Sequence, residues 1–339
     1  FKDGFYHGKG ALYRQDGSKY ISGKWSLGNP SGSMQFFKKG KNILQYEGEI
    51  QKLDSGGFSF QGEGTLYDER GQSVYQGNWL NGKRSGKGTA WLPDGIIYSG
   101  NWIDDQQDGQ GTYLFSTGEE YQGNFLKGKK HGRGIYKRAD GFVSYDGEWQ
   151  DNEKQGQGSA WFMDGSSYKG LWEKGKQHGK GTLTFSDGRV YAGNFKMGPP
   201  DGQGTMRRAN GSITYEGSWL QGRKHGEGRT YTETGLVRYH GQFFQGVQSG
   251  KGSEYRGDGT LYYEGEWKNN QRNGPGRIYA SNGTVVFEGT FLDNEPMGTG
   301  REFSEDGTKV YEGSYNRGRR NGKGVLYTQK GELLYSGTF

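Results

Sequence analysis

The chain has 339 residues, 44 Lys and Arg against 38 Asp and Glu, a formal net charge of +6, and only 29% hydrophobic residues. Its 15% aromatic content argues against disorder, its six prolines exclude collagen, and the absence of cysteine excludes disulfides, thiolate catalysis and cysteine zinc sites. No stretch reaches the roughly 18 apolar residues of a membrane-spanning helix, and no leader segment is recognisable. With 67 glycines, we expect an ordered but thin structure in which large rings supply most of the buried surface.

The first segment, residues 1–64, is predicted to hold irregular copies of a repeat. Ile21-Ser-Gly-Lys-Trp25 lacks the first aromatic of the later copies, and Gly32-Ser-Met34 lacks the second glycine of a Gly-x-Gly pair. Tyr46-Glu-Gly-Glu-Ile50 lacks the second aromatic and precedes an insertion. We expect residues 50–61 to form a longer loop carrying Phe58 and Phe60. This loop is either a hinge or bulge, or a contact site for a partner.

The second segment, residues 65–339, is predicted to be one continuous ribbon of regular repeats. Tyr75-Gln-Gly-Asn-Trp79 sets the pattern, and each copy continues with a Gly-x-Gly pair such as Gly86 and Gly88 and closes on a dipeptide such as Asp94-Gly95. The copies follow one another every 23 or 24 residues. Their first aromatics are Tyr75, Tyr98, Tyr121, Tyr145, Tyr168, Tyr191, Tyr215, Tyr239, Tyr263, Phe287 and Tyr311.

Each copy is predicted to form two antiparallel strands. The aromatic, glycine and aromatic at i, i+2 and i+4 lie on one face of a strand, and Asp-Gly or Asn-Gly steps are typical of tight hairpin turns, which need φ > 0. Helices are not expected, because glycine recurs in every helical window. We therefore predict an all-β fold, an elongated, single-layer, twisted antiparallel sheet of tandem β-hairpin repeats with about 26–28 strands. Rings such as Tyr75 and Trp79 are expected to cover strand glycines such as Gly86 and Gly88.

These motifs resemble the MORN (membrane occupation and recognition nexus) repeat, whose consensus is approximately Tyr-Glu-Gly-Glu-Trp-x-x-Gly-x-x-x-Gly-x-Gly. The resemblance covers nearly the whole chain. It implies a non-enzymatic scaffold for protein–protein interaction and assembly, in settings such as the cytoskeleton, cilia or membrane junctions. The expected location is the cytoplasm, associated with the cytoskeleton or a membrane, and an extracellular wall element stays an alternative.

Catalysis, cofactors and metals are not expected. The Gly-x-Gly pairs recur in every copy without a following helix or a phosphate-loop lysine, which argues against nucleotide binding. His131, His178 and His225 lie 47 residues apart, on the order of 19 Å at four strands, which is too far to share a metal. Nucleic-acid binding is not expected, because the aromatic rings are needed to cover the strand glycines and are not free to stack on bases.

Charge is segregated between the two kinds of turn. Asp94, Asp140, Asp164, Asp187, Asp258 and Asp306 mark the acidic or neutral turns. The turn between the two strands of a copy is basic, and stacked strands would align these residues into one edge. This edge serves either solubility or the docking of acidic protein segments or anionic lipid headgroups. The residues of this predicted basic edge are Lys83, Arg84, Lys129, Lys130, Lys176, Arg223, Lys224, Arg272, Arg319 and Arg320.

The two ends suggest self-association. Phe1 occupies a second-aromatic position, and Tyr335-Ser-Gly-Thr-Phe339 is a first strand without its turn. Open strand edges pair readily with other chains, so we expect head-to-tail association through these ends, or side-by-side dimers through the sheet face. The alternative is that the chain is the ordered part of a longer protein.

Overall fold

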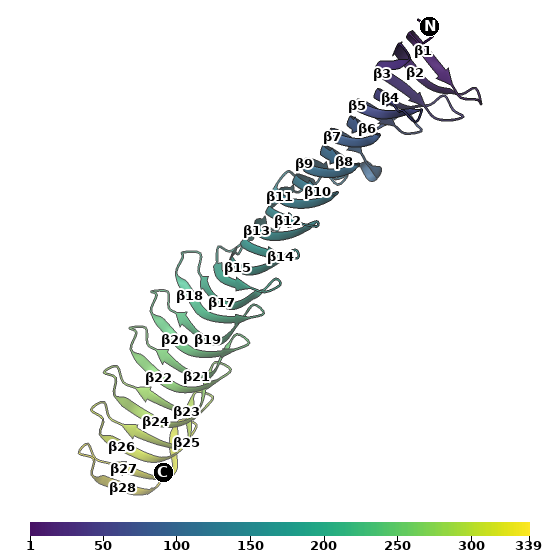
Figure 1. Cartoon of the computed structure of the whole chain (residues 1–339). Helices are drawn as coiled ribbons and strands as arrows, with labels where there is room; N and C mark the ends of the chain where they lie inside the picture. The colour runs from purple at the N-terminus through teal and green to yellow at the C-terminus, as the bar shows by residue number, and fades with distance from the viewer. The chain divides into compact units, whose positions relative to one another are not determined.

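The computed structural model describes all 339 residues, in two units, Phe1–Trp161 (unit 1) and Phe162–Phe339 (unit 2). Apart from one 3₁₀ turn, η1 (Pro93–Gly95), both units are built of β-strands (Figure 1). The glycine-rich strands stay extended because a helix of the same composition would lose stability at each glycine. The predicted all-β class is confirmed.

Unit 1 holds the first thirteen strands, from purple to teal in Figure 1. They are β1 (Gly8–Tyr13), β2 (Lys19–Ser26), β3 (Asn29–Phe37), β4 (Leu44–Lys52), β5 (Phe58–Tyr67), β6 (Ser73–Leu80), β7 (Lys83–Trp91), β8 (Ile97–Ile103), β9 (Gln106–Leu114), β10 (Glu120–Leu126), β11 (Lys129–Lys137), β12 (Val143–Gln150) and β13 (Glu153–Trp161). Each strand pairs antiparallel with the next along the chain.

Unit 2 repeats this arrangement, from teal to yellow in Figure 1. Its strands are β14 (Ser167–Glu173), β15 (Lys176–Thr184), β16 (Val190–Phe195), β17 (Pro200–Arg207), β18 (Ile213–Leu220), β19 (Arg223–Tyr231), β20 (Val237–Phe244), β21 (Val247–Tyr255), β22 (Leu261–Lys268), β23 (Gln271–Tyr279), β24 (Val285–Leu292), β25 (Glu295–Phe303), β26 (Lys309–Asn316), β27 (Arg319–Tyr327) and β28 (Leu333–Thr338). Consecutive strands again pair antiparallel. Within each unit the predicted single layer of tandem hairpins is confirmed.

The two kinds of turn differ in geometry. Except between β4 and β5, the turn inside each copy is a two-residue turn with both residues at positive φ, such as Asn81 (φ 53°) and Gly82 (φ 80°), which is the type I′ pattern. The Asp-Gly turns are longer than predicted. Their backbone closes over five residues, as between Phe185 and Arg189, and only the glycine has positive φ, except in the Asp94-Gly95 turn, where Asp94 has a φ of 64° as well. Asp187 instead accepts the backbone N–H of Arg189 at 3.0 Å.

The alternation between 23 and 24 residues corresponds to a β-bulge. Where two copies lie 24 residues apart, as from Tyr191 to Tyr215, the register shifts just before the first aromatic of the later copy, here between Met206 and Arg207. Where they lie 23 apart, as from Tyr75 to Tyr98, the pairing of β7 with β8 shows no shift. The extra residue is accommodated in the bulge, so it changes no side chain of the core.

The core of both units is a seam of tyrosine and tryptophan rings over a row of glycines. Tyr75 is buried, and its hydroxyl donates to the carbonyl of Asn78 at 3.0 Å. A Cβ added at Gly88 would collide with the hydroxyl and ring of Tyr75. The prediction that rings cover the strand glycines is confirmed, although a Cβ at Gly86 would meet Asn78 instead of a ring.

Tryptophan ties each copy to the one before it. The indole Nε1–H of Trp79 donates to the carbonyl of Gly64 at 3.3 Å, and that of Trp102 donates to Gly88 at 3.1 Å. The Trp102 ring also meets Tyr75 edge to face, with the centroids 5.4 Å apart. Stability therefore comes mainly from neighbouring copies, as in other repeat proteins.

The prediction of a long loop at residues 50–61 is wrong. β4 and β5 remain paired through this stretch, with Ile50 opposite Phe60 and Lys52 opposite Phe58. Only residues 53–57 form the connection, which Leu53 and Gly57 close through a backbone hydrogen bond of 3.1 Å. The insertion lengthens a hairpin because its residues continue the ladder of the preceding strands.

Candidate functional site

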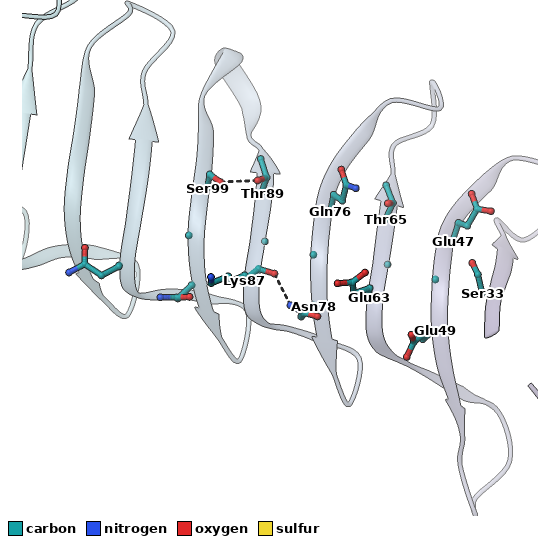
Figure 2. A pocket seen from close by; sticks show the side chains of 17 residues that line it. Ser33, Glu47, Glu49, Glu63, Thr65, Gln76, Asn78, Lys87, Thr89 and Ser99 are labelled. Carbon is teal, nitrogen blue, oxygen red and sulfur yellow. Dashed lines mark hydrogen bonds between the residues drawn. The ribbon is translucent and has the colours of Figure 1, made fainter. Parts of the chain in front are cut away.

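A groove crosses the strands of unit 1 on the face opposite the tyrosines. Its floor is a row of glycines in register, among them Gly64, Gly77 and Gly88, which face one another across β5, β6 and β7. Side chains on either side of this row form two walls (Figure 2). The groove has a volume of about 830 Å³. A Cβ at these positions would point toward the tyrosines, so the floor on the groove face is bare backbone, which another chain can approach closely.

The two walls of the unit 1 groove differ in charge. Apart from Glu47, one wall carries neutral polar groups, including Gln76, Thr89 and Ser99, the last two joined by a hydrogen bond of 3.0 Å (Figure 2). The opposite wall carries Glu49, Glu63 and Lys87 among amide side chains. Both walls offer hydrogen-bond donors and acceptors along the whole row.

Unit 2 contains a corresponding groove of about 690 Å³ with a charged wall. Arg277 contacts Glu288 at 2.8 Å, and Arg301 contacts Glu312 at 3.0 Å. Gly276 and the glycines paired with it form the floor. The two grooves therefore share a backbone geometry and differ in the chemistry of their walls. Neither was predicted, because the residues between the motif positions follow no recognisable pattern.

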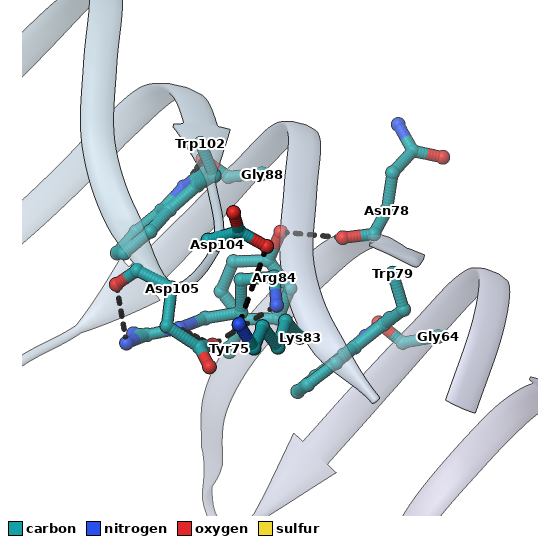
Figure 3. A network of polar contacts seen from close by, with 10 residues as sticks. All are labelled: Gly64, Tyr75, Asn78, Trp79, Lys83, Arg84, Gly88, Trp102, Asp104 and Asp105. Atoms are coloured by element: carbon teal, nitrogen blue, oxygen red, sulfur yellow. Dashed lines mark hydrogen bonds and ion pairs between the residues drawn. The ribbon is translucent and has the colours of Figure 1, made fainter. Parts of the chain in front are cut away.

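The predicted basic edge divides into two layers. In the first pair, Lys83 is exposed and lies 3.4 Å from Asp104, whereas Arg84 turns toward the seam (Figure 3). The Arg84 guanidinium lies 4.2 Å from the centroid of the Trp102 ring, and its Nε lies 3.0 Å from Asp105. The second residue of the pair thus makes a cation–π contact with the core.

The same division recurs in later copies. The Lys130 ammonium lies 4.6 Å from the Trp149 ring, Lys224 lies 5.0 Å from Tyr215, and burial lowers the pKa of both lysines. Arg272 and Arg320 lie over Tyr263 and Tyr311 in the same way. Residues of this inner layer face rings: Arg84, Lys130, Lys224, Arg272 and Arg320. The exposed outer layer comprises Lys83, Lys129, Lys176, Arg223 and Arg319. The prediction of one uniform basic edge is wrong in this respect, because half of its side chains pack against the seam.

Replacing Lys130 with glutamine is expected to destabilise the protein by about 1 kcal/mol, because the ammonium group loses its contacts with the surrounding rings. Lys129→Gln is the matched control. Lys129 is exposed and paired with Asp151 at 3.1 Å, and surface pairs contribute little, so its effect should be within about 0.5 kcal/mol. Urea unfolding measures both, and equal losses would contradict the division into two layers.

The acidic turns are held by their own side chains. Asp258 accepts the backbone N–H of Thr260 at 2.9 Å and its hydroxyl at 2.7 Å. These hydrogen bonds, the backbone one first, lower the pKa of the Asp258 carboxyl. The same contact links Asp140 to the N–H of Phe142. These carboxylates shape turns, which is a structural role.

The other sequence-predicted contact residues lie as follows. Phe60 stacks on Tyr46 at 3.8 Å, and Phe58 lies 5.8 Å from Trp25, so both rings belong to the core of unit 1 and supply the aromatic that Ile50 lacks. At the ends, Phe1 is 88% exposed, Tyr335 46% and Phe339 36%. Phe339 is held by backbone hydrogen bonds to Gly322 and by Tyr311, 5.0 Å away. Self-association through these ends stays a prediction.

No group of three or more His, Cys, Asp or Glu residues lies close enough to hold a metal ion. His178 is held by Glu173, 3.3 Å away. No helix of this chain has the length and apolar character to span a bilayer.

The model of one family, described as the MORN repeat, matches twelve segments of this chain. They are residues 1–19, 75–97, 98–120, 121–143, 145–167, 168–188, 191–213, 215–237, 239–261, 263–285, 287–309 and 311–332. Comparison with curated proteins gave no match.

Two solved structures illustrate the structural comparison. The TCP domain of SAS-4 (dCPAP) of Drosophila melanogaster, in complex with a proline-rich motif of Ana2 (dSTIL), matches with 13% identity and a TM-score of 0.30, covering 46% of this chain and 85% of that one. A point mutant of the TCP10 domain of Danio rerio CPAP matches with 10% identity and a TM-score of 0.18, covering 86% of this chain and all (100%) of that one.

Proposed function

This chain belongs to the family of MORN repeat proteins, and we propose that it is a non-enzymatic scaffold that holds partner proteins by binding extended segments of them in its two glycine-floored grooves. The observation that supports this proposal is the groove itself, which recurs in both units over several copies of the repeat. Such a scaffold suits the cytoskeletal or membrane-associated location expected for it in the cytoplasm.

The shape of the grooves favours an extended polypeptide over a small molecule. Small-molecule sites are mostly apolar and bury most of their ligand, whereas the side chains that line both grooves are polar. In unit 1 they stand on either side of an open row of glycines (Figure 2). A peptide main chain needs many donors and acceptors in sequence, and Gln76, Thr89, Ser99 and their neighbours provide them.

Filling the unit 1 groove is expected to abolish this binding. Gln76 is an exposed wall residue. Peptides are first selected for binding to this groove from a random displayed library, and Gln76→Trp should lower their affinity by about tenfold or more. Arg70→Trp, in the exposed turn before β6, is the matched control and should leave their affinity unchanged. Binding is measured by fluorescence polarisation on the full chain. If the selected peptides bind both variants as tightly as the unsubstituted protein, the groove has no role in binding them.

A second candidate is a peripheral tether that binds acidic phospholipid headgroups through the outer layer of the basic edge. One observation favours it. Leu80, Ile103 and Leu126 are 50%, 57% and 43% exposed and end three successive even strands at this edge. Leu80 lies opposite Lys83, and Leu126 lies opposite Lys129. Apolar side chains beside basic ones are typical of surfaces that bind the membrane interface.

Vesicle flotation distinguishes the second candidate from the first. The protein should float with vesicles that contain phosphatidylserine at physiological salt and remain behind with pure phosphatidylcholine. Lys83→Gln with Lys129→Gln should lower the bound fraction, and Lys87→Gln, a groove residue of equal charge, should not. Absence of flotation, or equal effects of edge and groove substitutions, would remove the lipid candidate and leave the groove proposal standing.

A further inference from the structure

A row of aromatic side chains runs along unit 2 beside the charged wall of its groove. It has one ring on each of five successive odd strands, β19 to β27, each in the same position of its copy. All five side chains are partly exposed. We call this row the aromatic stripe, and it consists of Tyr231, Tyr255, Tyr279, Phe303 and Tyr327.

Mainly aliphatic side chains of the even strands lie opposite the rings of the aromatic stripe. Tyr231 pairs with Val237, and Tyr255 pairs with Leu261. The remaining register partners of the stripe are Val285, Lys309 and Leu333. The surface across these ten strands is therefore apolar at nine of its ten positions.

The stripe lies on the same face as the charged wall. The hydroxyl of Tyr231 donates to Glu216 at 2.9 Å, and that of Tyr279 donates to Glu264 at 3.0 Å. At the far end, the Lys309 ammonium lies 4.6 Å from the centroid of Tyr327. Rings and carboxylates thus form one continuous surface.

The spacing of the rings indicates what this surface can bind. Rings on successive odd strands are two strands apart, about 9.6 Å at the usual strand separation. A polyproline II helix has three residues per turn and rises about 3.1 Å per residue, or about 9.3 Å per turn. Its every third side chain would therefore meet one ring after another, whereas successive turns of an α-helix, about 5.4 Å apart, would not.

We propose that unit 2 binds a polyproline II segment that carries proline or another apolar residue at every third position and runs across the strands along the aromatic stripe. The inference rests on the proposed function, for which it names the class of partner. Preformed polyproline II segments lose little entropy on docking to aromatic-lined surfaces.

The charges beside the stripe add a second requirement. Arg277 and Arg301 are paired with Glu288 and Glu312, whereas Glu216 and Glu264 take part in no ion pair and accept only the tyrosine hydroxyls. These two carboxylates are four strands apart, about 19 Å, and six residues of polyproline II span about 18.6 Å. A segment with Lys or Arg at every sixth position is complementary to them.

Unit 1 has no such unbroken row. Rings end β1, β3, β5 and β7 (Tyr13, Phe37, Tyr67 and Trp91), but Phe37 is buried, and β9 and β11 end in Leu114 and Lys137. Trp161 ends β13, the next odd strand after that of Lys137, and is 37% exposed. Trp161 therefore provides a control that has the same position in its copy but lies outside the stripe.

The test uses a peptide of Pro-Ala-Arg-Pro-Ala-Ala units and a peptide of the same composition in shuffled order, each titrated into the full chain. The ordered peptide should bind at least about tenfold more tightly than the shuffled one. Tyr255→Ala should weaken binding of the ordered peptide about tenfold, whereas Tyr255→Phe, which keeps the ring and guards against a folding defect, and Trp161→Ala should not change it. Glu264→Gln should reduce the preference for this peptide over one with Gln in place of Arg, because only Glu216 then remains to attract the arginines.

Equal binding of the ordered and shuffled peptides, or equal effects of Tyr255→Ala and Trp161→Ala, would overturn the inference. A different set of outcomes tests the proposed function itself. If the proline peptide does not bind but library-selected segments of another composition do, and groove substitutions weaken them, the scaffold stands and the polyproline partner is wrong. If no extended segment responds to substitutions in either groove, both are wrong.

Discussion

Replacing Gly134 with alanine is expected to destabilise unit 1 by about 3 kcal/mol, the upper end of the usual cost of overpacking. The added Cβ would collide with the hydroxyl and ring of Tyr121. Tyr121 is fully buried, with its hydroxyl donating to the carbonyl of Asn124 at 2.9 Å. The ring has no free direction in which to move, so the strands must separate. The change in free energy of unfolding is measured by urea denaturation.

Gly141→Ala is the control for backbone effects. Gly141 lies in a turn with φ at +81°, and a Cβ there would meet nothing within 4 Å. Its substitution should cost only the strain of the left-handed conformation, about 1 kcal/mol. A loss at Gly134 no larger than that at Gly141 would contradict the covering role of the tyrosine.

Both units are expected to unfold cooperatively as the pH rises from about 10 to about 12. Burial raises the pKa of Tyr75, Tyr191 and Tyr263 to about 12, from an ordinary value of 10.0. Because the unfolded chain releases these protons first, the stabilisation is complete below pH 10. Above pH 10 the equilibrium constant for folding falls by about a factor of ten per tyrosine for each pH unit, until the pKa of the folded state is reached. Circular dichroism and tyrosinate absorbance should therefore change together.

One copy already shows the matched substitution for this experiment. Phe287 stands where other copies have the first tyrosine, and it packs on Phe291 with the centroids 5.3 Å apart. Tyr191→Phe should therefore fold and make alkaline unfolding of unit 2 less steep. Unfolding that is complete below pH 10, or unaltered by this variant, would show that tyrosine ionisation does not control it.

The sequence predicts the seam well because strand periodicity is simple. Tyr75 and Gly77 are two residues apart, so they share a face of β6, and the partner strand places Gly88 opposite Gly77. Repetition in many copies then determines the fold class. The two-residue alternation is sufficient wherever the strands stay in register.

Alternation fails beyond a bulge, which is why the basic edge was predicted incorrectly. The register shifts between Gly77 and Trp79, so the position of Arg84 relative to the rings cannot be derived by counting from the glycines. The paired bases Lys83 and Arg84 look equivalent in the sequence, yet one is exposed and the other lies over Trp102.

The grooves and the stripe escaped prediction for another reason. Gln76 and Glu264 occupy the same position in their copies, but their types differ because packing in the seam does not constrain them. Only the structure shows that such residues line one surface. Tyr255 and Tyr279 recur at a fixed spacing, and this period was the one available signal.

Pairing limited to chain neighbours has a mechanical consequence. Within a unit no strand is held by one distant in sequence, so a pulling force can detach one hairpin without disturbing the next. Each copy of 23 or 24 residues would release on the order of 80 Å of chain. Under load, such a protein would lengthen in steps, and each step would lower the tension on the rest of the chain. When the force is removed, a detached hairpin can pair again with the neighbouring strand that stayed folded.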